Sequence, residues 1–342
     1  MPHKVTLQST QQVIEVLDDE SVLTAAMRQG IVIPYGCRNG ACGSCKGKVL
    51  EGSVDYGNHA HYILPDYEKK QGLALFCQAK PLTDLVIDAR VINVAGQPEV
   101  RKLPCRVQRI ERAADDVIIL TLSLPANDRL EFFAGQYIEI ILRDGKRRAF
   151  SMANPPHADP AVELHIRAMP GGVFTEYAFN KMKEKDILRF EGPLGTFYLR
   201  GESDKPVILL ASGTGFAPIK SLIEEALHQG IKRPMVLYWG GRKRADIYRM
   251  ELAQSWAAEH EHFEFIPVLS EAPESDQWQG RTGFVHRAVM QDFPDLSGYE
   301  VYACGAPVMV DAARKDFSEQ CNLPEDAFYC DSFTPAVAAP AT

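Results

Sequence analysis

The fold of the N-terminal region is decided by the stretch YGCRNGACGSC, which occupies residues 35–45. This stretch contains Cys37, Cys42 and Cys45, and with the later Cys77 it gives the spacing C-x4-C-x2-C-x31-C. Glycine and alanine lie between the first three cysteines, and such small residues let a loop wrap closely around a compact group with backbone N–H groups turned inward. The spacing therefore predicts that four thiolates converge on one small inorganic centre.

The same spacing indicates which centre the four cysteines hold. A C-x4-C-x2-C run followed by a distant fourth cysteine is typical of the plant-type [2Fe–2S] cluster, which changes state by one electron. A zinc site would favour two short C-x-x-C pairs, whereas here only Cys42 and Cys45 form such a pair. We therefore expect a [2Fe–2S] cluster on Cys37, Cys42, Cys45 and Cys77, with zinc or free thiols as the alternatives.

Length and composition exclude several classes of protein. A chain of 342 residues predicts two or three domains. The net charge of −8 argues against non-specific nucleic-acid binding, which needs a basic face. The N-terminus has no apolar signal segment, and no run approaches the roughly 18 apolar residues of a membrane span. These features predict a cytoplasmic protein without membrane segments, in which Cys105, Cys321 and Cys330 are buried thiols.

The hydrophobic pattern divides the chain into three domains. Residues 1–92 combine short alternating strands with a helix capped by Ser21, and residues 93–101 read as a linker containing glycine and proline. Residues 102–203 contain strand after strand at regular spacing, which predicts an antiparallel β-barrel interrupted by one helix near 175–182.

The last domain has a different order of secondary-structure elements. From residue 204 to 335 buried strands alternate with amphipathic helices, which predicts a doubly wound parallel sheet. Residues 336–342 are small and proline-bearing, and they read as a disordered tail. The expected fold class is thus multidomain α+β and α/β.

Two segments of the barrel carry residues suited to a flavin. The first is RAFS at residues 148–151, and the second is HIR at 165–167 followed by PGGVFT at 170–175. A guanidinium suits a diphosphate, an aromatic ring suits stacking on a π-system, and a helix N-terminus after glycines presents free N–H groups to an anion. In their order, and with EGPLGTF following at 191–197, these segments resemble the ferredoxin–NAD(P)H reductase superfamily.

That resemblance implies specific roles for the barrel residues. Arg148 would bind the flavin pyrophosphate, Phe150 would lie on the isoalloxazine in place of the usual tyrosine, and Ser151 would hydrogen-bond near flavin N5 as part of the catalytic centre. The flavin diphosphate would also be bound by the second segment, through His165, Arg167, Gly171, Gly172, Val173 and Thr175. Members of the superfamily with this domain order generally carry FAD.

The last domain carries a glycine turn suited to a nicotinamide dinucleotide. ASGTGFAP at 211–218 follows a buried strand and leads into a helix expected over 218–228, which is the context of a dinucleotide phosphate loop. It resembles the superfamily's G-T-G-x-x-P variant, in which Gly213, Thr214, Gly215 and Pro218 approach the nicotinamide side of the cofactor. The resemblance places the adenosine ribose near Arg242 and Tyr248. We expect NADH, with NADPH open because an arginine near the ribose also suits a 2′-phosphate.

The remaining catalytic residues come from the C-terminal part of the chain. The run CGAPVM begins at Cys304 and Gly305 and resembles the superfamily's Cys-Gly-x-Pro turn beside the nicotinamide. There the thiol would help to position the carbon that gives up the hydride. Phe333 resembles the terminal aromatic residue that covers the flavin, with a core phenylalanine as the alternative.

The domain order resembles the one-chain reductases of bacterial multicomponent oxygenases and the reductase partner of CDP-6-deoxy-hexulose-3-dehydrase. The resemblance implies that NADH gives a hydride to FAD and that electrons then pass singly through the cluster to an acceptor protein. We expect a monomer whose exposed cluster loop, with Arg38 and the nearby Tyr35 and Asn39, is the docking surface. The acceptor would be an oxygenase component or, alternatively, a dehydrase. A third possibility is direct reduction of a small molecule such as free flavin or a ferric chelate.

Overall fold

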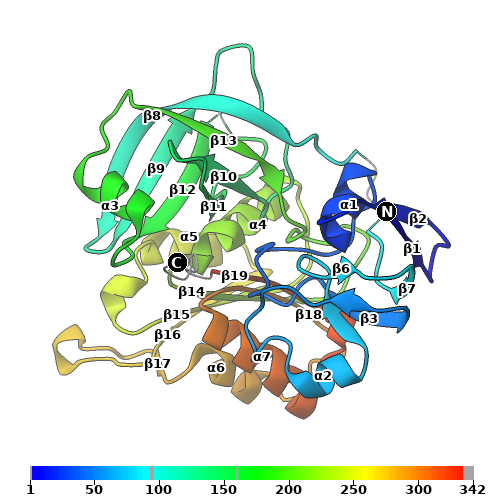
Figure 1. Ribbon diagram of the computed structural model, residues 1–342. Helices are drawn as coiled ribbons and strands as arrows, with labels where there is room; N and C mark the ends of the chain where they lie inside the picture. The colour runs from blue at the N-terminus through cyan, green and yellow to red at the C-terminus, as the bar shows by residue number, and fades with distance from the viewer. Residues whose placement is uncertain (1, 93–95, 159–160, 334–342) are drawn as a thin grey trace. The chain divides into compact units, whose positions relative to one another are not determined.

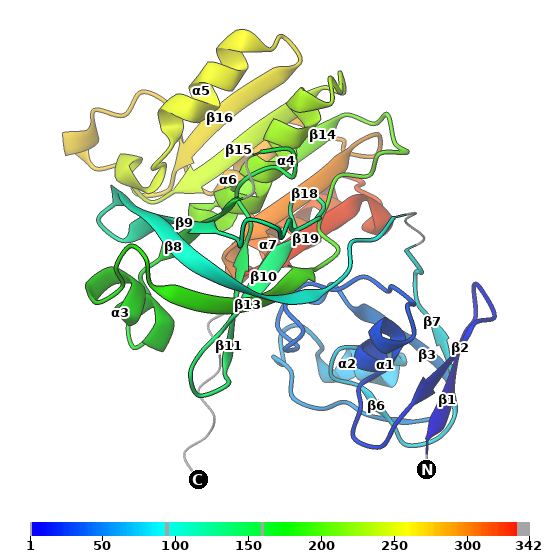
Figure 2. The same cartoon turned by 90° about the horizontal axis from the view of Figure 1, so that it is seen from above.

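The computed structural model describes residues 2–92, 96–158 and 161–333, and the chain divides into two compact units (Figures 1 and 2). We call Met1–Gln97 the cluster unit and Pro98–Thr342 the dinucleotide unit. The boundary falls within the predicted linker 93–101, of which residues 93–95 lie outside the described part. The predicted tail, 336–342, also lies outside it.

The cluster unit is built on a sheet with the strand order β2-β1-β7-β3-β5, in which β1 and β7 are parallel and the other pairs antiparallel. The side chain of Ser21 accepts a hydrogen bond from the backbone N–H of Thr24, which confirms the predicted cap of α1. The elements are β1 His3–Leu7, β2 Val13–Val16, α1 Val22–Arg28, β3 Lys46–Glu51, β4 Val54–Asp55, α2 Asp66–Lys70, β5 Leu73–Leu75, β6 Lys80–Pro81 and β7 Leu85–Asp88.

The first half of the dinucleotide unit is a six-stranded antiparallel barrel with the order β11-β10-β13-β8-β9-β12. An antiparallel bridge between Met152 and Leu164 joins the two end strands, so the sheet closes as the regular strand spacing predicts. The elements are β8 Arg101–Ala114, β9 Val117–Ser123, β10 Tyr137–Ile141, β11 Arg147–Ser151, β12 Ala161–Arg167, α3 Val173–Asn180 and β13 Ile187–Leu194.

The second half is an all-parallel sheet with the order β17-β16-β15-β14-β18-β19. Helices cover both of its faces, α4 and α5 on one side and α6 and α7 on the other (Figure 1), so the predicted doubly wound sheet is confirmed. The strands and helices are β14 Val207–Ser212, α4 Phe216–His228, β15 Met235–Gly241, α5 Met250–Glu259, β16 Phe263–Leu269, β17 Arg281–Thr282, α6 Val285–Asp292, β18 Glu300–Gly305, α7 Pro307–Gln320 and β19 Phe328–Ser332.

The burial of β14 explains why the sheet positions a site at its edge. Val207, Ile208, Leu209, Leu210 and Ala211 are all inaccessible to solvent, as expected for a strand covered on both faces. The chain then leaves the sheet through a single 3₁₀ turn, η1 Gly213–Gly215, and enters α4 directly. The carboxyl ends of β14 and β18 meet at this turn, which is where ligands bind in open parallel sheets.

Candidate cofactor sites

The four thiols of the cluster unit lie in two pairs. The thiol of Cys37 is hydrogen-bonded to Cys42, and the thiol of Cys45 is hydrogen-bonded to Cys77. The hydrogen bond from Cys37 lowers the pKa of Cys42, so one sulfur of that pair favours the thiolate form that iron binds. Among the described residues no three His, Cys, Asp or Glu side chains converge on a single metal ion. Two thiol pairs fit the two irons of a [2Fe–2S] cluster, each of which takes two protein ligands.

Residues 35–45, the cluster loop, are shaped for this arrangement by their backbone. Gly40 and Gly43 have positive φ values of 78° and 73°, and a Cβ at Gly40 would lie 2.5 Å from the carbonyl oxygen of Asn58. The backbone N–H groups of Cys37 and Ala41 each donate to a cysteine sulfur over 3.4 Å. The loop therefore presents both thiolates and N–H groups, and it fits a compact anionic cluster.

The flavin segment of the barrel lies at the end of β11. Ser151 is buried there, while Arg148 and Phe150 are half-buried. The ring of Phe150 lies 5.1 Å from that of Phe174, which belongs to the first turn of α3. The two predicted flavin segments are thus neighbours in the folded barrel, although 20 or more positions separate RAFS from α3 in the sequence.

The turn before α3, residues 170–175, is the second half of this candidate flavin site. Gly172 caps the helix without any side-chain hydrogen bond, so the first N–H groups of α3 have no capping side chain. The hydroxyl of Thr175 is occupied, because it bonds to the backbone of Met169 and Gly172. Thr175 therefore holds the turn in shape, and the geometry leaves the backbone N–H groups for a diphosphate.

The nucleotide turn, Gly213–Gly215, requires glycine for two different reasons. Gly213 has a positive φ of 54°, and a Cβ there would lie 2.8 Å from a guanidinium nitrogen of Arg167. A Cβ at Gly215 would lie 2.1 Å from the carbonyl oxygen of Cys304, so any side chain would overlap the backbone of β18. This close approach joins the turn to the carboxyl end of β18. The predicted start of the helix at Pro218 is two residues late, because α4 begins at Phe216.

The C-terminal residues predicted to be catalytic gather at the same edge. Cys304 is fully buried, and this burial, together with the charge of Asp331, raises the pKa of its thiol well above the ordinary value. Its thiol is therefore protonated at neutral pH and is not a nucleophile. The backbone N–H of Phe333 donates to the carbonyl of Gly305 over 2.8 Å, which places the predicted terminal aromatic beside the nucleotide turn.

The two residues predicted at the adenosine ribose have different surroundings. The side chain of Arg242 is 64% exposed, and its backbone N–H donates to a carboxylate oxygen of Asp246 over 2.8 Å. Tyr248 faces inward instead, where its hydroxyl lies 2.7 Å from Nδ1 of His165 in the barrel. Arg242 is thus available to a ribose or phosphate, whereas the hydroxyl of Tyr248 is already bonded.

His165 and Arg167 also differ from what the resemblance implies. The side chain of His165 is inaccessible to solvent, and both its nitrogens are engaged, with Tyr248 and with Glu163 at 3.1 Å. It has no free donor for a flavin diphosphate. Arg167 lies against Gly213, with Nε 3.2 Å from Asp116 and Nη2 3.6 Å from Asp246, and neither nitrogen makes a hydrogen bond. These buried N–H groups fit an anion at the nucleotide turn better than one at α3.

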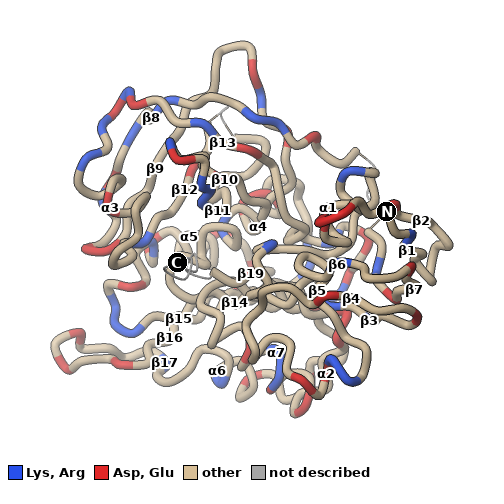
Figure 3. Tube along the Cα trace, viewed as in Figure 1, with Lys and Arg blue, Asp and Glu red and all other residues tan. Residues whose placement is uncertain are grey.

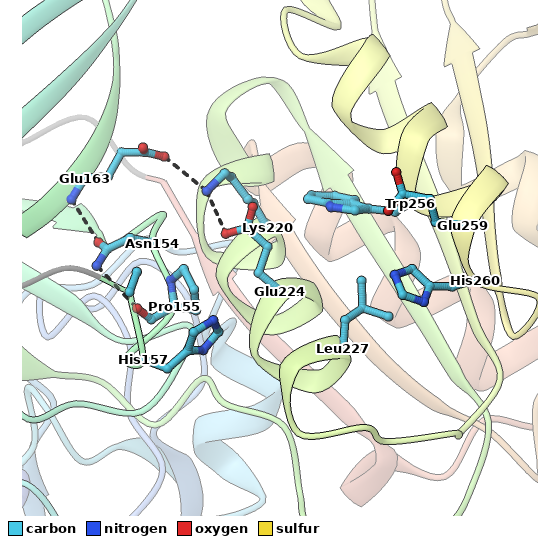
Figure 4. A pocket seen from close by; sticks show the side chains of 11 residues that line it. Asn154, Pro155, His157, Glu163, Lys220, Glu224, Leu227, Trp256, Glu259 and His260 are labelled. Atoms are coloured by element: carbon cyan, nitrogen blue, oxygen red, sulfur yellow. Dashed lines mark hydrogen bonds and ion pairs between the residues drawn. The ribbon is translucent and has the colours of Figure 1, made fainter.

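Sequence reasoning missed a polar groove between the barrel and the sheet. It has a volume of about 480 Å³, and Figure 4 shows Asn154 and Glu163 of the barrel opposite Lys220 and Glu224 of α4. Lys220 contacts Glu163, Glu224 and the carbonyl of Ala153 over 3.3, 2.8 and 3.1 Å. The spacing of Lys220 and Glu224 on one helix face was a signal for their pair, but no local pattern linked either residue to Glu163.

Charge and hydropathy add two observations. Figure 3 shows basic and acidic residues interspersed along the described parts of both units. None of the helices in those parts has the length and apolar character needed to cross a bilayer.

Three protein-family models match successive parts of the chain. They describe a 2Fe-2S iron-sulfur cluster binding domain over residues 5–82, an oxidoreductase FAD-binding domain over 104–198 and an oxidoreductase NAD-binding domain over 209–315. These ranges contain the four cysteines, the two flavin segments and the nucleotide turn respectively. The predicted set of a [2Fe–2S] cluster, FAD and a nicotinamide dinucleotide is thereby confirmed.

Characterised proteins resemble the chain over nearly its whole length. The CDP-6-deoxy-L-threo-D-glycero-4-hexulose-3-dehydrase reductase of Yersinia pseudotuberculosis is 38% identical over 92% of this chain and 94% of its own. The reductase component of phenol 2-monooxygenase from a Pseudomonas species is 38% identical over 92% of this chain and 89% of its own.

A solved structure agrees with these relatives. The cytochrome P450 reductase GcoB of Amycolatopsis has a TM-score of 0.78 and 34% identity, covering 97% of this chain and 99% of that one. The chain therefore belongs to the family of one-chain oxidoreductases that join a 2Fe-2S iron–sulfur domain to FAD-binding and NAD-binding domains.

Proposed function

We propose that the chain oxidises NADH in its dinucleotide unit and delivers electrons singly, from its cluster unit, to a separate acceptor protein. When bound, FAD accepts a hydride and the [2Fe–2S] cluster carries one electron at a time. The observation that carries the proposal is the pairing of Cys37 with Cys42 and of Cys45 with Cys77 in a domain of its own. A whole domain for single-electron transfer is not needed to reduce a small molecule at the flavin.

The residues of the dinucleotide unit bind and orient in this proposal. Arg148 and the N-terminus of α3 hold the flavin diphosphate, Phe150 contacts the flavin ring, and Ser151 hydrogen-bonds near N5. The nucleotide turn receives the nicotinamide half of NADH. Cys304 acts there through its backbone and its bulk, since its thiol keeps its proton.

The nicotinamide cofactor is NADH in this proposal. One carboxylate oxygen of Asp246 accepts from the backbone N–H groups of Arg242 and Lys243, and Nε of Arg242 lies 3.8 Å from the same oxygen. A carboxylate next to the expected ribose site favours a ribose hydroxyl over a 2′-phosphate. Parallel titrations with NADH and NADPH decide the point, and equal half-saturating concentrations would contradict a preference for NADH.

The acceptor is a protein, and we favour an oxygenase or hydroxylase component. Several similar proteins are named as reductase components of phenol 2-monooxygenase, terephthalate 1,2-dioxygenase and an aromatic O-demethylase. The 38% identity to the dehydrase reductase supports a dehydrase as the second candidate. The chain is expected to act as a monomer with either one.

The acceptor would dock at the accessible edge of the cluster loop. Asn39 is exposed and Arg38 is half-buried, whereas Tyr35, which the sequence suggested as a contact residue, is only 6% exposed and belongs to the core. Arg38 would steer an acidic surface of the acceptor, so Arg38→Gln should slow electron delivery at low salt more than at high salt.

An anaerobic titration with NADH tests the proposed function. Visible absorption follows the flavin, and electron paramagnetic resonance follows the cluster in the same samples. Reduction of the flavin together with a [2Fe–2S] signal is the expected result. A flavin that is fully reduced while an intact cluster remains oxidised would instead point to direct reduction of small molecules.

A further inference from the structure

A series of partly buried hydrogen bonds, centred on the buried side chain of His165, connects the barrel with the parallel sheet inside the dinucleotide unit. Glu163 and His165 lie on β12, two positions apart, so their side chains share one face of the strand. Tyr248 lies between β15 and α5 of the parallel sheet. Its hydroxyl is 2.7 Å from Nδ1 of His165, and Nε2 of His165 is 3.1 Å from Oε1 of Glu163.

The charge on Glu163 fixes which group donates in each hydrogen bond of this series. Burial favours a neutral carboxyl, but the hydrogen bond from His165 and the charge of Lys220 hold the pKa of Glu163 at about 2. An ionised carboxylate only accepts, so Nε2 of His165 carries the hydrogen. Burial lowers the pKa of His165, which keeps the ring neutral and makes Nδ1 an acceptor. The Tyr248 hydroxyl must therefore donate to His165.

Tyr248, the last residue of this hydrogen-bonded series, is connected to the nucleotide turn through aromatic contacts. The ring of Tyr248 packs edge-on against Trp239, with centroids 5.2 Å apart, and against Phe216 at 6.2 Å. The indole N–H of Trp239 donates to the carbonyl of Gly213 over 3.1 Å. A shift of Tyr248 would therefore move Trp239 and, through it, the backbone of Gly213 in the turn proposed to bind the nicotinamide.

Other contacts also join the barrel to the sheet. The buried hydroxyl of Ser221 donates to the carbonyl of Asn154 over 2.8 Å, and Arg249 pairs with Glu111 over 2.6 Å in a partly exposed ion pair that contributes little free energy. The series through His165 differs from these contacts because it joins three side chains in succession, and a buried donor or acceptor that loses its partner costs about 1–3 kcal/mol. Its groups therefore constrain the relative placement of barrel and sheet.

We propose that Glu163, His165 and Tyr248 form a positioning triad that fixes the barrel against the parallel sheet and so sets the spacing between flavin and nicotinamide. The inference rests on the proposed function for its kinetic consequence. The triad leaves the Tyr248 hydroxyl with no hydrogen to donate to the adenosine ribose, although its oxygen can still accept one. In this proposal the three residues act through the geometry that they maintain.

The test compares Tyr248→Phe with Tyr238→Phe in the full-length, FAD-loaded protein. Tyr238 is a matched control, because its hydroxyl also makes one hydrogen bond to a side chain, the carboxylate of Asp292 over 2.6 Å, but that bond lies within the sheet domain. In anaerobic stopped-flow reduction by NADH, Tyr248→Phe should lower the saturating rate roughly tenfold or more, since small misplacements are costly. Its half-saturating NADH concentration should stay near that of the wild type, and Tyr238→Phe should leave both values unchanged.

Two outcomes of the kinetic test would overturn the triad. One is a Tyr248→Phe rate equal to that of the wild type. The other is an unchanged rate with a raised half-saturating NADH concentration, which would make Tyr248 a ligand of the dinucleotide. If Tyr248→Phe does not fold, Glu163→Gln replaces it, because this change keeps the side-chain size and removes the charge that selects the tautomer.

A second readout needs no NADH and separates the triad from the proposed function. The ¹⁵N NMR shifts of the histidine rings should show His165 neutral with its hydrogen on Nε2, and the Nδ1 shift should change in Tyr248→Phe but not in Tyr238→Phe. A protonated ring, or a hydrogen on Nδ1, would overturn the triad even if NADH reduces the flavin. A wild-type flavin that NADH does not reduce would overturn the proposed function, and the NMR result would still decide the triad.

Discussion

The cluster loop and the nucleotide turn are both rich in glycine, but the glycines serve different purposes. In the cluster loop Gly40 and Gly43 adopt positive φ values, and the chemistry comes from the four cysteine side chains around them. In the nucleotide turn Gly215 has ordinary backbone angles, and glycine is required because the backbone of Cys304 passes where a Cβ would be. Gly43 is needed for its own backbone conformation and Gly40 both for its conformation and for its approach to Asn58, whereas Gly215 depends only on a neighbour 89 positions away (304 − 215).

The largest expected effect is the loss of a cluster ligand. Cys77→Ser should remove nearly all of the cluster's absorption, because the Cys45–Cys77 pair supplies both protein ligands of one iron. Reduction of the flavin by NADH should persist, since the dinucleotide unit is a separate compact body. Iron content and visible spectra provide the measurement.

The control for this change is another buried thiol. Cys105 lies in the barrel core of the dinucleotide unit, so Cys105→Ser should keep the full iron content. A Cys77→Ser protein with the iron content and the visible spectrum of the wild type would show that Cys77 is not a ligand, because an oxygen ligand in its place would change the spectrum.

The next effect tests the close approach at the nucleotide turn. Gly215→Ala places a Cβ 2.1 Å from the Cys304 carbonyl oxygen, and neither backbone can move without distorting the sheet. We expect a loss of about 3 kcal/mol in the free energy of unfolding, and a fall of roughly 10 °C in the melting temperature of the dinucleotide unit. Differential scanning calorimetry would resolve this change.

Gly298→Ala is the matched control in the same unit, because a Cβ at Gly298 meets nothing within 4 Å. Its melting temperature should stay within a degree or two of the wild type. Equal melting temperatures for Gly215→Ala and Gly298→Ala would mean that the turn can open away from β18 at little cost.

The difference between local conformation in the cluster loop and a distant neighbour at the nucleotide turn also explains how much of the molecule could be predicted from the sequence. The cysteine spacing, the alternating strands of the barrel and the buried run of β14 are local patterns, and the cluster and both folds followed from them. The cap at Ser21 is equally local, and it is confirmed. The resemblance to a known superfamily added the cofactors, which the family models bear out.

The side-chain surroundings could not be predicted in the same way. His165 and Tyr248 are 83 positions apart, and only the packing of the barrel on the sheet brings them together. Tyr35 was expected to be a surface contact because it is the first residue of the cluster loop, but its ring belongs to the hydrophobic core of the cluster unit. Helices α2, α6 and α7 also went unpredicted. Neighbours in the fold, not neighbours in the sequence, decide what a polar or aromatic side chain does.

The smallest expected effect is on how the free energy of unfolding depends on pH, because the contact between barrel and sheet contains the buried side chain of His165. Burial lowers the pKa of His165 below its ordinary value of 6.5, so on acidification the unfolded chain takes up a proton before the folded chain does. The free energy of unfolding should therefore fall as the pH drops below about 6.5, with a slope of at most about 1.4 kcal/mol per pH unit from one proton. In His165→Gln the dinucleotide unit should lose the contribution of His165 to this slope. It should keep the contributions of His262 and His286, whose pKa values are also lowered by burial. Urea unfolding at pH 5 to 7 measures the slope, with His228→Gln as the control outside the triad. Identical slopes for wild type and His165→Gln would show that His165 is not held neutral.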